Sequence, residues 1–429
     1  MTIGSKMVVI AFISFLLIIG VRSEFVNTFV DRRVNLETQL IRVWTTVRFI
    51  RHGSESENIY EYLIDDYEAQ HYVRFTDRDG SILDHKLMND ETVHVNLSNE
   101  QDLFHVEEVF WNCIVVLQKR KPFRKPDYIR YIGNIYYYSR YTTLRYNVKY
   151  VIDTHYYVNI EPHVVNNYTS EYKFTNPLAA LSKKRIEFEI ITSKPLIHVI
   201  SLERIIDVSH YGRISIHERV VLQNNGAKVI GSYKPTAKEW FYTFLPSSAE
   251  DVHLYDTLGV RYNWKFVPNE NYTSIEFRSR FPLLGGWKYS YDLSYTVPSY
   301  EYLYVTDEAR YLLKMRVFDH VLNDAIIDSF VTKVILPENS VNYDVLKPDG
   351  FPSDISEETT ITTLSCFGRK TVVIAGGSVI ENHIDDFIIE YSIGWINMLR
   401  VPLKLSLWLY IAFICIIFTI RFSAWISLK

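Results

Sequence analysis

The sequence predicts a mainly β protein in which two tandem antiparallel β-sandwich-like domains precede one transmembrane α-helix. Apolar and polar residues alternate along many segments, which is the pattern of a strand with one buried face. The 429 residues include 32 Tyr, 24 Phe and 8 Trp, and aromatic residues favour strands. An apolar run near the carboxyl end has about the length of a membrane span.

The first element is an apolar segment at the amino terminus. A lysine precedes the apolar run Val8–Ile19, and the small or β-branched residues Val21 and Ser23 follow it. This order predicts a secretory signal peptide over residues 1–23, cleaved between Ser23 and Glu24. An uncleaved membrane anchor is the alternative, but the run is short for a span.

Alternation of apolar and polar residues is clearest in four segments spread over the chain. Each segment places apolar side chains on one face and polar side chains on the other, as a half-buried strand requires. These segments are Ile41–Phe49, Ile186–Ile190, Leu313–Val317 and Phe387–Ile393. The chain lacks the regular alternation of strands with helices that a doubly wound fold needs, so antiparallel sheets are favoured.

A turn near Val208–Gly212 is the expected boundary between the two domains. Strand-like runs of similar length lie on both sides of it, which gives domains 24–210 and 211–400. Ser248–Asp251 has the pattern of a helix start, because a capping serine precedes acids in the first turn. The sequence shows no fixed-period repeat at the residue level.

Leu403–Ile420 is the expected transmembrane helix, within a segment from 401 to 421. Its polar members are Lys404, Ser406 and Thr419. So few polar residues argue against the alternative, a buried core helix. The far end of this segment carries Arg421, Trp425 and Lys429, which is typical of a cytosolic boundary. Residues 422–429 are therefore the expected short cytosolic tail, and the bulk of the chain is expected in the lumen.

Cysteines and short motifs agree with a luminal location. Cys113 and Cys366 lie outside the span, and they either pair or remain two separate buried thiols. Asn96, Asn167 and Asn271 each begin an Asn-x-Ser/Thr triplet. In a secretory chain these triplets predict glycans on exposed turns or strand edges.

No catalytic residue, cofactor site or metal site is predicted. The chain lacks a His-Glu-x-x-His pair, a Gly-x-Ser-x-Gly elbow and a phosphate-binding glycine loop. Asp65–Asp66 and Asp385–Asp386 are expected at exposed strand ends, and Asp319–His320 would point to opposite faces of a strand. The basic stretch Lys119–Lys125 is expected to be a solvated loop, with binding to acidic lipids or a partner as the alternative. The net charge of −4 argues against nucleic acid as a partner.

A set of longer motifs resembles the ribophorin I family, subunit 1 of the oligosaccharyltransferase complex of the endoplasmic reticulum. The two main motifs are Arg280–Lys288 and Val297–Tyr304. Four further stretches agree in order and spacing, namely Val208–Gly212, Leu245–Pro246 followed by Asp251–Val252, Met315–Val321 and Val334–Glu338. The match is dense from about residue 200 to 340 and thinner in the amino-terminal half.

The resemblance implies a non-catalytic subunit of a complex that N-glycosylates nascent proteins in the endoplasmic reticulum membrane. It would stabilise the complex and help to present substrate. The implied partners are other subunits of the complex, nascent glycoprotein chains and the lipid bilayer, with no cofactor. Catalysis would belong to a different, multi-span subunit with a Trp-Trp-Asp-Tyr-Gly signature, which this sequence lacks.

The motif residues have two open interpretations, packing of the second domain or contact with a partner. They are Phe281, Pro282, Gly285, Gly286, Trp287, Pro298, Tyr300 and Glu301. Two other functions compete with the family assignment. One is a type I β-sandwich cell-surface receptor or adhesion protein, and the other is a luminal hydrolase whose site no motif reveals.

Overall fold

A computed structural model describes residues 25–427 apart from short internal gaps. The gaps are 52–57, 66–69, 90, 153–155, 159–163, 167–168, 232–239, 261–263, 270, 307–309, 349–350 and 362–367. The predicted signal peptide and its cleavage site, Ser23 and Glu24, lie outside the described residues. So do Asn167 and Cys366, so the structure does not test the pairing of Cys113 with Cys366.

The chain divides into two compact units. Unit 1 comprises Met1–Lys194 and Val229–Gly231, and unit 2 comprises Pro195–Lys228 and Ser232–Lys429. The boundary expected near Val208–Gly212 falls inside unit 2 instead. There the chain turns between the antiparallel strands β16 (Ile197–Asp207) and β17 (Arg213–Asn224). A glycine-containing turn between two strand patterns has the same sequence signature whether it joins strands or domains.

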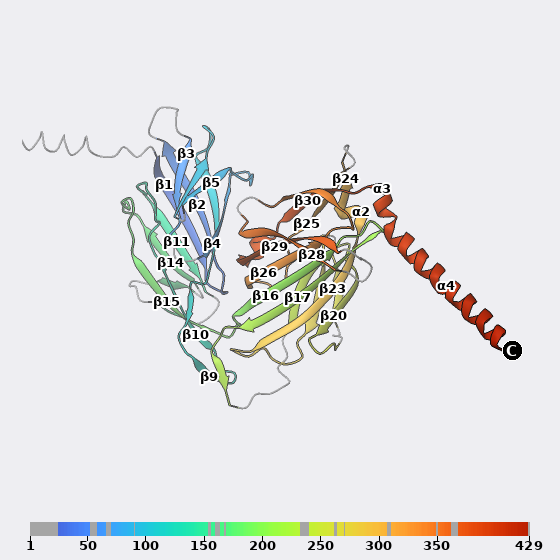
Figure 1. The fold of residues 1–429 in the computed structure, drawn as a ribbon. Coiled ribbons are helices and arrows are strands. Elements are labelled where there is room, and N and C mark those ends of the chain that lie inside the picture. Colours follow the sequence, from blue (N-terminus) through green and yellow to red (C-terminus); the bar gives the residue numbers. More distant parts are fainter. Residues whose placement is uncertain are drawn as a thin grey trace, which may run out of the picture. The chain divides into compact units, whose positions relative to one another are not determined.

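Unit 1 is built from short and long strands (Figure 1). Burial alternates along strands such as β1 and β2, so one face of each lies against a core. The strands are β1 (Phe25–Asn35), β2 (Ile41–Arg51), β3 (Ile59–Leu63), β4 (Gln70–Thr76), β5 (His85–Asn89), β6 (Thr92–Asn96), β7 (Leu103–Trp111), β8 (Ile114–Val116), β9 (Arg120–Pro122), β10 (Asp127–Asn134), β11 (Tyr146–Val151), β12 (Tyr156–Val158), β13 (Val164–Asn166), β14 (Thr169–Phe174) and β15 (Arg185–Thr192). They form sheets in the orders β13-β14-β11-β1-β2-β7-β4, β3-β6-β5 and β12-β15-β10-β8, and β9 pairs with β18 (Lys228–Ile230).

Unit 2 follows with β16, β17 and a second series of strands. The remaining strands are β19 (Trp240–Pro246), β20 (Glu250–Asp256), β21 (Trp264–Pro268), β22 (Tyr272–Arg278), β23 (Lys288–Pro298), β24 (Leu303–Val305), β25 (Tyr311–Arg316), β26 (Ile326–Ile335), β27 (Val341–Leu346), β28 (Ser353–Thr360), β29 (Arg369–Ile380) and β30 (Asp386–Ser392). The helices are α2 (Ser299–Tyr302), a 3-10 turn at Glu381–His383, α3 (Trp395–Met398) and α4 (Arg400–Ser427). The sheet orders are β20-β23-β17-β16-β26-β29-β28, β19-β22-β21 and β24-β25-β30-β27.

The mainly β prediction is confirmed, and the four expected strands match β2, β15, β25 and β30. The large sheets are mixed rather than purely antiparallel, because β1 pairs in parallel with β11 and β16 with β26. The helix expected at Ser248–Asp251 is wrong. A turn there leads directly into β20, whose pairing with β23 is irregular between Glu250 and His253.

The two units repeat one topology. In unit 1 the first strand, β1, pairs antiparallel with β2 and parallel with β11. In unit 2 the first strand, β16, pairs antiparallel with β17 and parallel with β26. When β9 and β18 are left out and the strands of each unit are numbered in chain order, the three sheets of unit 1 have the same strand orders as the three sheets of unit 2. The chain therefore contains a structural duplication that no residue-level repeat announces.

The duplication extends to single residues in the first strand of each unit. A bulge interrupts the pairing of β1 with β2 at Thr28, and a bulge interrupts the pairing of β16 with β17 at Ile200. Four residues after the bulge, each strand carries an arginine, Arg32 in β1 and Arg204 in β16. These arginines occupy equivalent positions.

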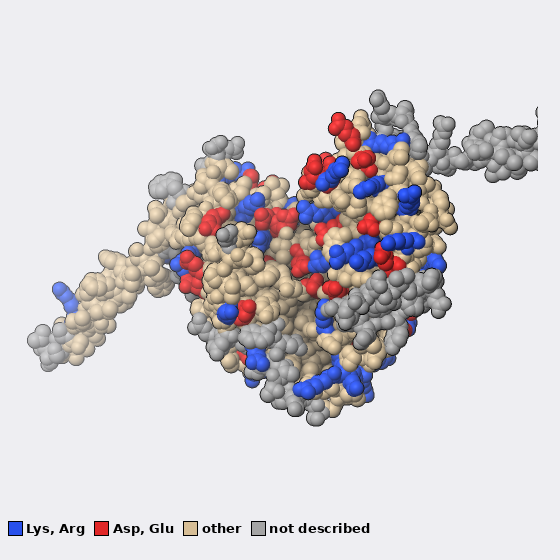
Figure 2. Space-filling model, turned by 180° about the vertical axis from the view of Figure 1, so that it is seen from behind, with Lys and Arg blue, Asp and Glu red and all other residues tan. Residues whose placement is uncertain are grey.

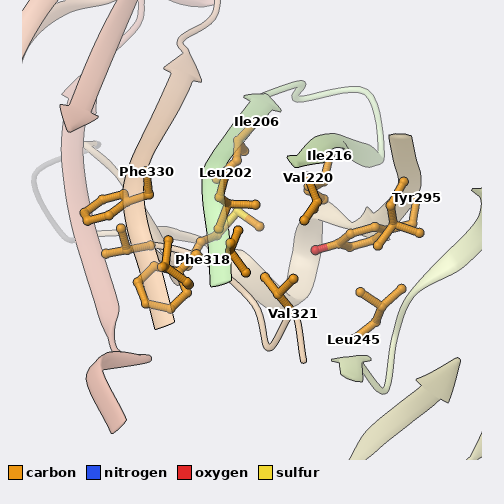
Figure 3. Packing of buried hydrophobic residues seen from close by; sticks show 14 of the residues in the cluster. Leu202, Ile206, Ile216, Val220, Leu245, Tyr295, Phe318, Val321 and Phe330 are labelled. Atoms are coloured by element: carbon orange, nitrogen blue, oxygen red, sulfur yellow. The ribbon is translucent and has the colours of Figure 1, made fainter. Parts of the chain in front are cut away.

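The core of unit 2 lies between its seven-stranded sheet and its two smaller sheets. Buried apolar side chains from β16, β17 and β23 pack with residues of β19, β22, β25 and β30. Figure 3 shows Leu202 and Ile206 of β16 beside Phe318 and Phe330, with Tyr295 of β23 at the other side of the cluster. In unit 1, Phe25 on β1 contacts Tyr60 on β3 with ring centroids 5.4 Å apart, so a large and a small sheet also pack there.

Helix α4 is apolar along most of its length. The part from Pro402 to Ser423 is long and apolar enough to cross a membrane, and none of that segment is buried against the rest of the described chain. Figure 2 shows positive and negative side chains interspersed over one face of the units, whereas α4 carries almost none. This helix matches the predicted span and extends beyond it at both ends.

Candidate functional site

A buried ion cluster occupies the core of unit 2. Arg204 on β16 contacts Glu218 on β17, and its Nη1 lies 2.7 Å from Oδ2 of Asp319 in the loop after β25. The hydroxyl of Tyr295 on β23 also donates to Asp319. The side chains of Arg204 and Asp319 are 1% exposed and that of Glu218 is 4% exposed, so water does not share these contacts.

The cluster holds one arginine against two carboxyl groups. Burial raises the pKa of Glu218 to about 7, and Arg204 opposes that shift. One guanidinium neutralises one carboxylate, so a second buried carboxylate is costly and takes up a proton more readily. Arg316 lies at the solvent side of the cluster, with Nη1 at 3.9 Å from Oδ1 of Asp319.

Unit 1 contains a second cluster of the same composition. Arg32 Nη1 lies 3.0 Å from Oδ2 of Asp65, and the side-chain amide of Asn134 donates to Oδ1 of Asp65 at 3.0 Å. Glu108 is buried in the same core, and burial raises its pKa to about 7 against the opposing charge of Arg32. Both units thus bury an arginine with one bonded aspartate and one glutamate of raised pKa.

The glutamates do not occupy equivalent positions. Arg204 faces Glu218 across β16 and β17, whereas Arg32 faces Thr45 across β1 and β2. On the next strand, Glu108 of β7 stands where β23 has Tyr295, because each lies two residues after the partner of Thr45 or Glu218. The arginine is common to both units, and its acids are not.

These clusters lie in the cores of the two units and do not form an open site. Their carboxyl groups are already bonded or buried, so a substrate in solution does not reach them. The sequence does contain a signal for them that the alternation argument passed over. Arg204 lies between Leu202 and Ile206 in the apolar phase of its strand, and a charge in that phase must be paired or neutral.

The expectation that the two acid pairs are exposed is wrong for Asp65, whose side chain is 10% exposed. Asp65 binds Arg32, while Asp66 lies outside the described residues. Asp385 Oδ1 accepts the backbone N–H of Asp386, and Asp386 Oδ2 lies 3.5 Å from Nζ of Lys314 on an exposed face. These contacts are those of a strand end and a surface ion pair.

The Asp319–His320 pair also separates. Asp319 enters the buried cluster, whereas the ring of His320 packs on Phe244 with centroids 4.4 Å apart. Nε2 of His320 lies 3.6 Å from Oε2 of Glu381. The two neighbours therefore have different partners.

Two of the three predicted glycan sites fall on described residues. Asn96 is exposed at the end of β6, and Ser98 of its triplet is exposed as well. Asn271 is exposed in the turn between β21 and β22, but Thr273 of its triplet is buried. Both asparagines can carry a bulky group without entry into the core.

The glycine pair of the family motif makes a tight turn against a neighbouring loop. Gly286 has a φ of +81°, a conformation that L-residues with side chains rarely adopt. A Cβ on Gly285 would lie 2.0 Å from the carbonyl oxygen of Ala227. Asn224 fixes the turn, because its side chain donates to the Leu283 carbonyl at 2.8 Å and its carbonyl accepts from Gly286 at 2.7 Å.

The aromatic motif residues divide between core and surface. Phe281 packs edge-on against Trp287 at 5.9 Å and Tyr289 at 5.4 Å, and Phe281 and Trp287 both lie against the core of unit 2. Pro282 is buried beside them, and Pro298 precedes α2. Tyr300 is 77% exposed and Glu301 is exposed, so the packing interpretation fits the first motif and the contact interpretation fits the second.

The basic stretch Lys119–Lys125 lies around β9. Lys121 pairs with Asp127, and Arg124 has a φ of +67° in the turn that follows β9. Among the described residues, no group of three or more His, Cys, Asp or Glu side chains is placed to hold a metal ion.

Comparison with known proteins identifies a family and several relatives. The family model described as Ribophorin I matches residues 25–420. Subunit 1 of dolichyl-diphosphooligosaccharide–protein glycosyltransferase from Caenorhabditis elegans is 32% identical over 265 residues, which is 58% of this chain and 44% of that protein. Subunit 1A from Arabidopsis thaliana is 28% identical over 231 residues, which is 51% of this chain and 37% of that protein.

A rice relative extends the same series. Subunit 1B from Oryza sativa is 26% identical over 237 residues, covering 52% of this chain and 50% of that protein. The chain thus spans half or less of the length of these three relatives. Among solved structures, native yeast LTA4 hydrolase matches 40% of this chain and 30% of its own at 13% identity and a TM-score of 0.27, a similarity too low to carry an argument.

Proposed function

The chain belongs to the ribophorin I family, and from that premise we propose that it is a non-catalytic subunit of an oligosaccharyltransferase complex. The observation that carries the proposal is the family match over residues 25–420. Relatives from an animal and two plants are named as subunit 1 of that glycosyltransferase, which supports the same role. The complex transfers a preassembled oligosaccharide to the Asn of Asn-x-Ser/Thr triplets.

A scaffolding role fits the bonding of the acidic residues. Glycan transfer requires activation of a weakly nucleophilic carboxamide and stabilisation of a departing pyrophosphate. In the cores of the two units, Asp65 and Asp319 instead bind Arg32 and Arg204. Asp386 pairs with Lys314 at the surface. We therefore assign the catalytic step to a different, multi-span subunit.

We place the bulk of the chain in the lumen of the endoplasmic reticulum, with α4 as a single membrane span. The signal-like segment at residues 1–23 and the apolar part of α4 support this orientation. Asn96 and Asn271 are exposed, which suits glycan acceptors in that compartment. The net charge of −4 gives no reason to expect nucleic acid as a partner.

The duplicated topology offers a way to hold nascent chains. In both units the outer strand of the three-stranded sheet, β5 or β21, is an exposed edge. Leu87 and Met88 on β5 are each 54% exposed, and Phe266 and Val267 on β21 are 42% and 36% exposed. An edge strand with apolar side chains can pair with an extended, unfolded polypeptide. We propose that these edges help to present substrate.

Affinity purification from membranes solubilised in mild detergent tests the subunit assignment. The tagged full chain should co-purify with a multi-span subunit that carries the Trp-Trp-Asp-Tyr-Gly signature, together with glycan-transfer activity on an acceptor peptide. Recovery of the folded chain with no other subunit and no activity would overturn the proposal. Recovery with cell-surface receptors would support the adhesion alternative.

The edge strands are tested by charge substitution within the same preparation. Leu87→Lys with Met88→Lys, and Phe266→Lys with Val267→Lys, should weaken crosslinking to nascent chains while the complex stays assembled. Leu258→Lys is the matched control, because Leu258 is 69% exposed but lies outside both edges. Unchanged crosslinking in both double variants would contradict the role of the edges.

A further inference from the structure

We propose that the end of unit 2 next to α4 lies in the headgroup layer of the bilayer, through a membrane-facing collar of exposed aromatic and aliphatic side chains. The collar comprises Tyr211, Tyr300, Tyr304, Val305, Val341 and Ile396, which are 49–77% exposed. Its partner is the lipid surface. The inference rests on α4 as a span and does not depend on membership of a glycosyltransferase complex.

An ion pair joins unit 2 to the span itself. Lys404 lies two residues inside the apolar segment Pro402–Ser423, whose 22 residues are about 33 Å long and match a hydrocarbon core of about 30 Å. The Nζ of Lys404 lies 2.7 and 2.8 Å from the two carboxylate oxygens of Glu338. Glu338 is 8% exposed, in the loop between β26 and β27. Unit 2 therefore touches the helix at the level where the hydrocarbon begins.

Several contacts fix α3 to the same end of unit 2. The hydroxyl of Tyr211 donates to the Met398 carbonyl, and the hydroxyl of Tyr311 lies 3.9 Å from the Met398 sulfur. The side-chain amide of Asn339 donates to Asn397 at 3.2 Å. Unit 2 cannot move away from the bilayer surface unless these bonds and the Lys404–Glu338 pair break.

The pairing of strands in the four-stranded sheet places part of the collar at this end. In the four-stranded sheet, Val305 faces Tyr311, which faces Tyr391, and Val341 faces Ser392 at the start of the connection to α3. The collar residues on β24 and β27 thus border the strand ends that lead into α3 and α4. The N–H of Ser299 donates to the Gly212 carbonyl at 3.0 Å, which joins α2 with Tyr300 to the turn with Tyr211.

The composition of the collar suits an interface between lipid and water. Three of its six members are tyrosines, whose apolar rings and polar hydroxyls suit the headgroup level. Two nearby cations are paired, because Arg310 lies 3.1 Å from Glu390 and Arg213 lies 3.1 Å from Glu250. Paired charges and tyrosines are tolerated in the headgroup layer, which is polar and hydrated.

Site-specific fluorescence in liposomes tests this placement. A polarity-sensitive dye is attached at Tyr300→Cys, Val305→Cys or Leu258→Cys, in a full-length chain whose cysteines at 113, 366 and 415 are replaced by Ala. Leu258 is the control, because it lies far from the collar. It follows Asp256, which pairs with Tyr291 on β23, and Tyr291 is about 23 Å along that strand from Pro298. All three positions are exposed, so the dyes should not disturb the core.

Lipids that carry a nitroxide near the headgroup should remove most of the emission at positions 300 and 305 and leave that at 258 unchanged. Equal, weak quenching at all three positions in inserted protein would overturn the proposal. Quenching that is weak in lipid alone, with positions 300 and 305 protected in the purified complex, would assign the collar to a protein partner and also overturn it. Glu338→Gln with Lys404→Met should reduce quenching at 300 and 305, because it removes an ion pair that helps to hold this end at the surface.

Discussion

Unit 1 and unit 2 have the same sheet orders, the same bulge in the first strand pair and an arginine at the same place, yet they satisfy that arginine differently. In unit 2 the acids are Glu218 on the second strand and Asp319 in the loop after β25. In unit 1 they are Glu108 on β7 and Asp65 after β3. The topology fixes where a long cation is buried, and any element that reaches it can supply the counter-charge.

The two clusters also differ in how completely they are enclosed. The carboxylate of Asp65 is 10% exposed and also accepts a bond from Asn134, whereas that of Asp319 is 1% exposed. Loss of the arginine should therefore leave more buried charge unpaired in unit 2 than in unit 1.

Arg204→Met should destabilise unit 2 by about 3–5 kcal/mol, because it leaves two buried carboxyl groups without a cation. Arg32→Met should cost less, since Asp65 keeps its bond to Asn134 and its access to water. Denaturant unfolding of the full chain, followed by hydrogen exchange in each unit, measures both effects. An equal or larger loss in Arg32→Met would contradict the comparison.

A combined variant separates the cost of a lost contact from the cost of leaving buried carboxylates unpaired. Arg204→Met together with Glu218→Leu and Asp319→Leu removes every charge of the unit 2 cluster. Replacement of a whole buried ion cluster by apolar residues is often neutral or stabilising, so most of the lost stability should return. A triple variant as unstable as Arg204→Met would show that the arginine acts through packing alone.

The raised pKa values of Glu108 and Glu218 predict a pH dependence in both units. Each folded-state pKa is about 7, above the ordinary value of 4.5, so the folded state binds the proton more tightly than the unfolded state. The stabilisation is present below about pH 4.5 and is lost as the pH rises to about 7. Glu218→Gln and Glu108→Gln cannot ionise and should lack this part of the pH dependence. Unfolding curves of each variant and the wild type between these pH values should diverge; parallel curves would show ordinary carboxyl groups.

The glycine pair tests a turn that stands between β22 and β23 in unit 2. Gly285→Ala should cost about 1–3 kcal/mol, because its Cβ would overlap the Ala227 carbonyl. Gly286→Ala should cost about 1–2 kcal/mol from the left-handed backbone. Gly80→Ala is the control in unit 1, with a φ of +82° but open space around it, and should resemble Gly286→Ala. A Gly285→Ala variant with unchanged thermal stability would contradict the close approach.

The smallest effects concern the glycan sites, which flank equivalent strands at opposite ends. Asn96 ends β6, and Asn271 precedes β22. Asn96→Gln and Asn271→Gln should each raise gel mobility by one glycan and change stability by less than about 0.5 kcal/mol, as exposed sites do. If neither variant shifts and endoglycosidase has no effect on the wild type, the assignment of these sites fails.

The fold class follows from the sequence because strand alternation is a local property. The segments Ile41–Phe49 and Phe387–Ile393 are predicted as strands; the first lies within β2, and the second lies within β30 except for its last residue. The duplication is not predicted, because topology depends on which strands pair, and unrelated side chains can fill equivalent positions. Thr45 and Glu218, for example, share one position and no chemistry.

The candidate sites divide in the same way. Exposure of Asn96 and Asn271 follows from polar, turn-forming surroundings, which the sequence displays. The partners of Arg204 do not, because Asp319 is 115 residues away and only the fold brings it near. The Lys404–Glu338 pair is a similar case, since the sequence suggests a lysine that reaches the interface alone and the structure supplies a carboxylate.

Glycosylation of a reporter with several Asn-x-Ser/Thr triplets, in cells depleted of this chain, tests the assignment most directly. The account predicts under-glycosylation that is restored by the wild-type chain and, within a few-fold, by Asp385→Asn with Asp386→Asn. Loss of about 10²-fold in transfer with an assembled complex carrying that double variant would indicate a direct catalytic role. Normal glycosylation after depletion of the chain would contradict its place in the complex.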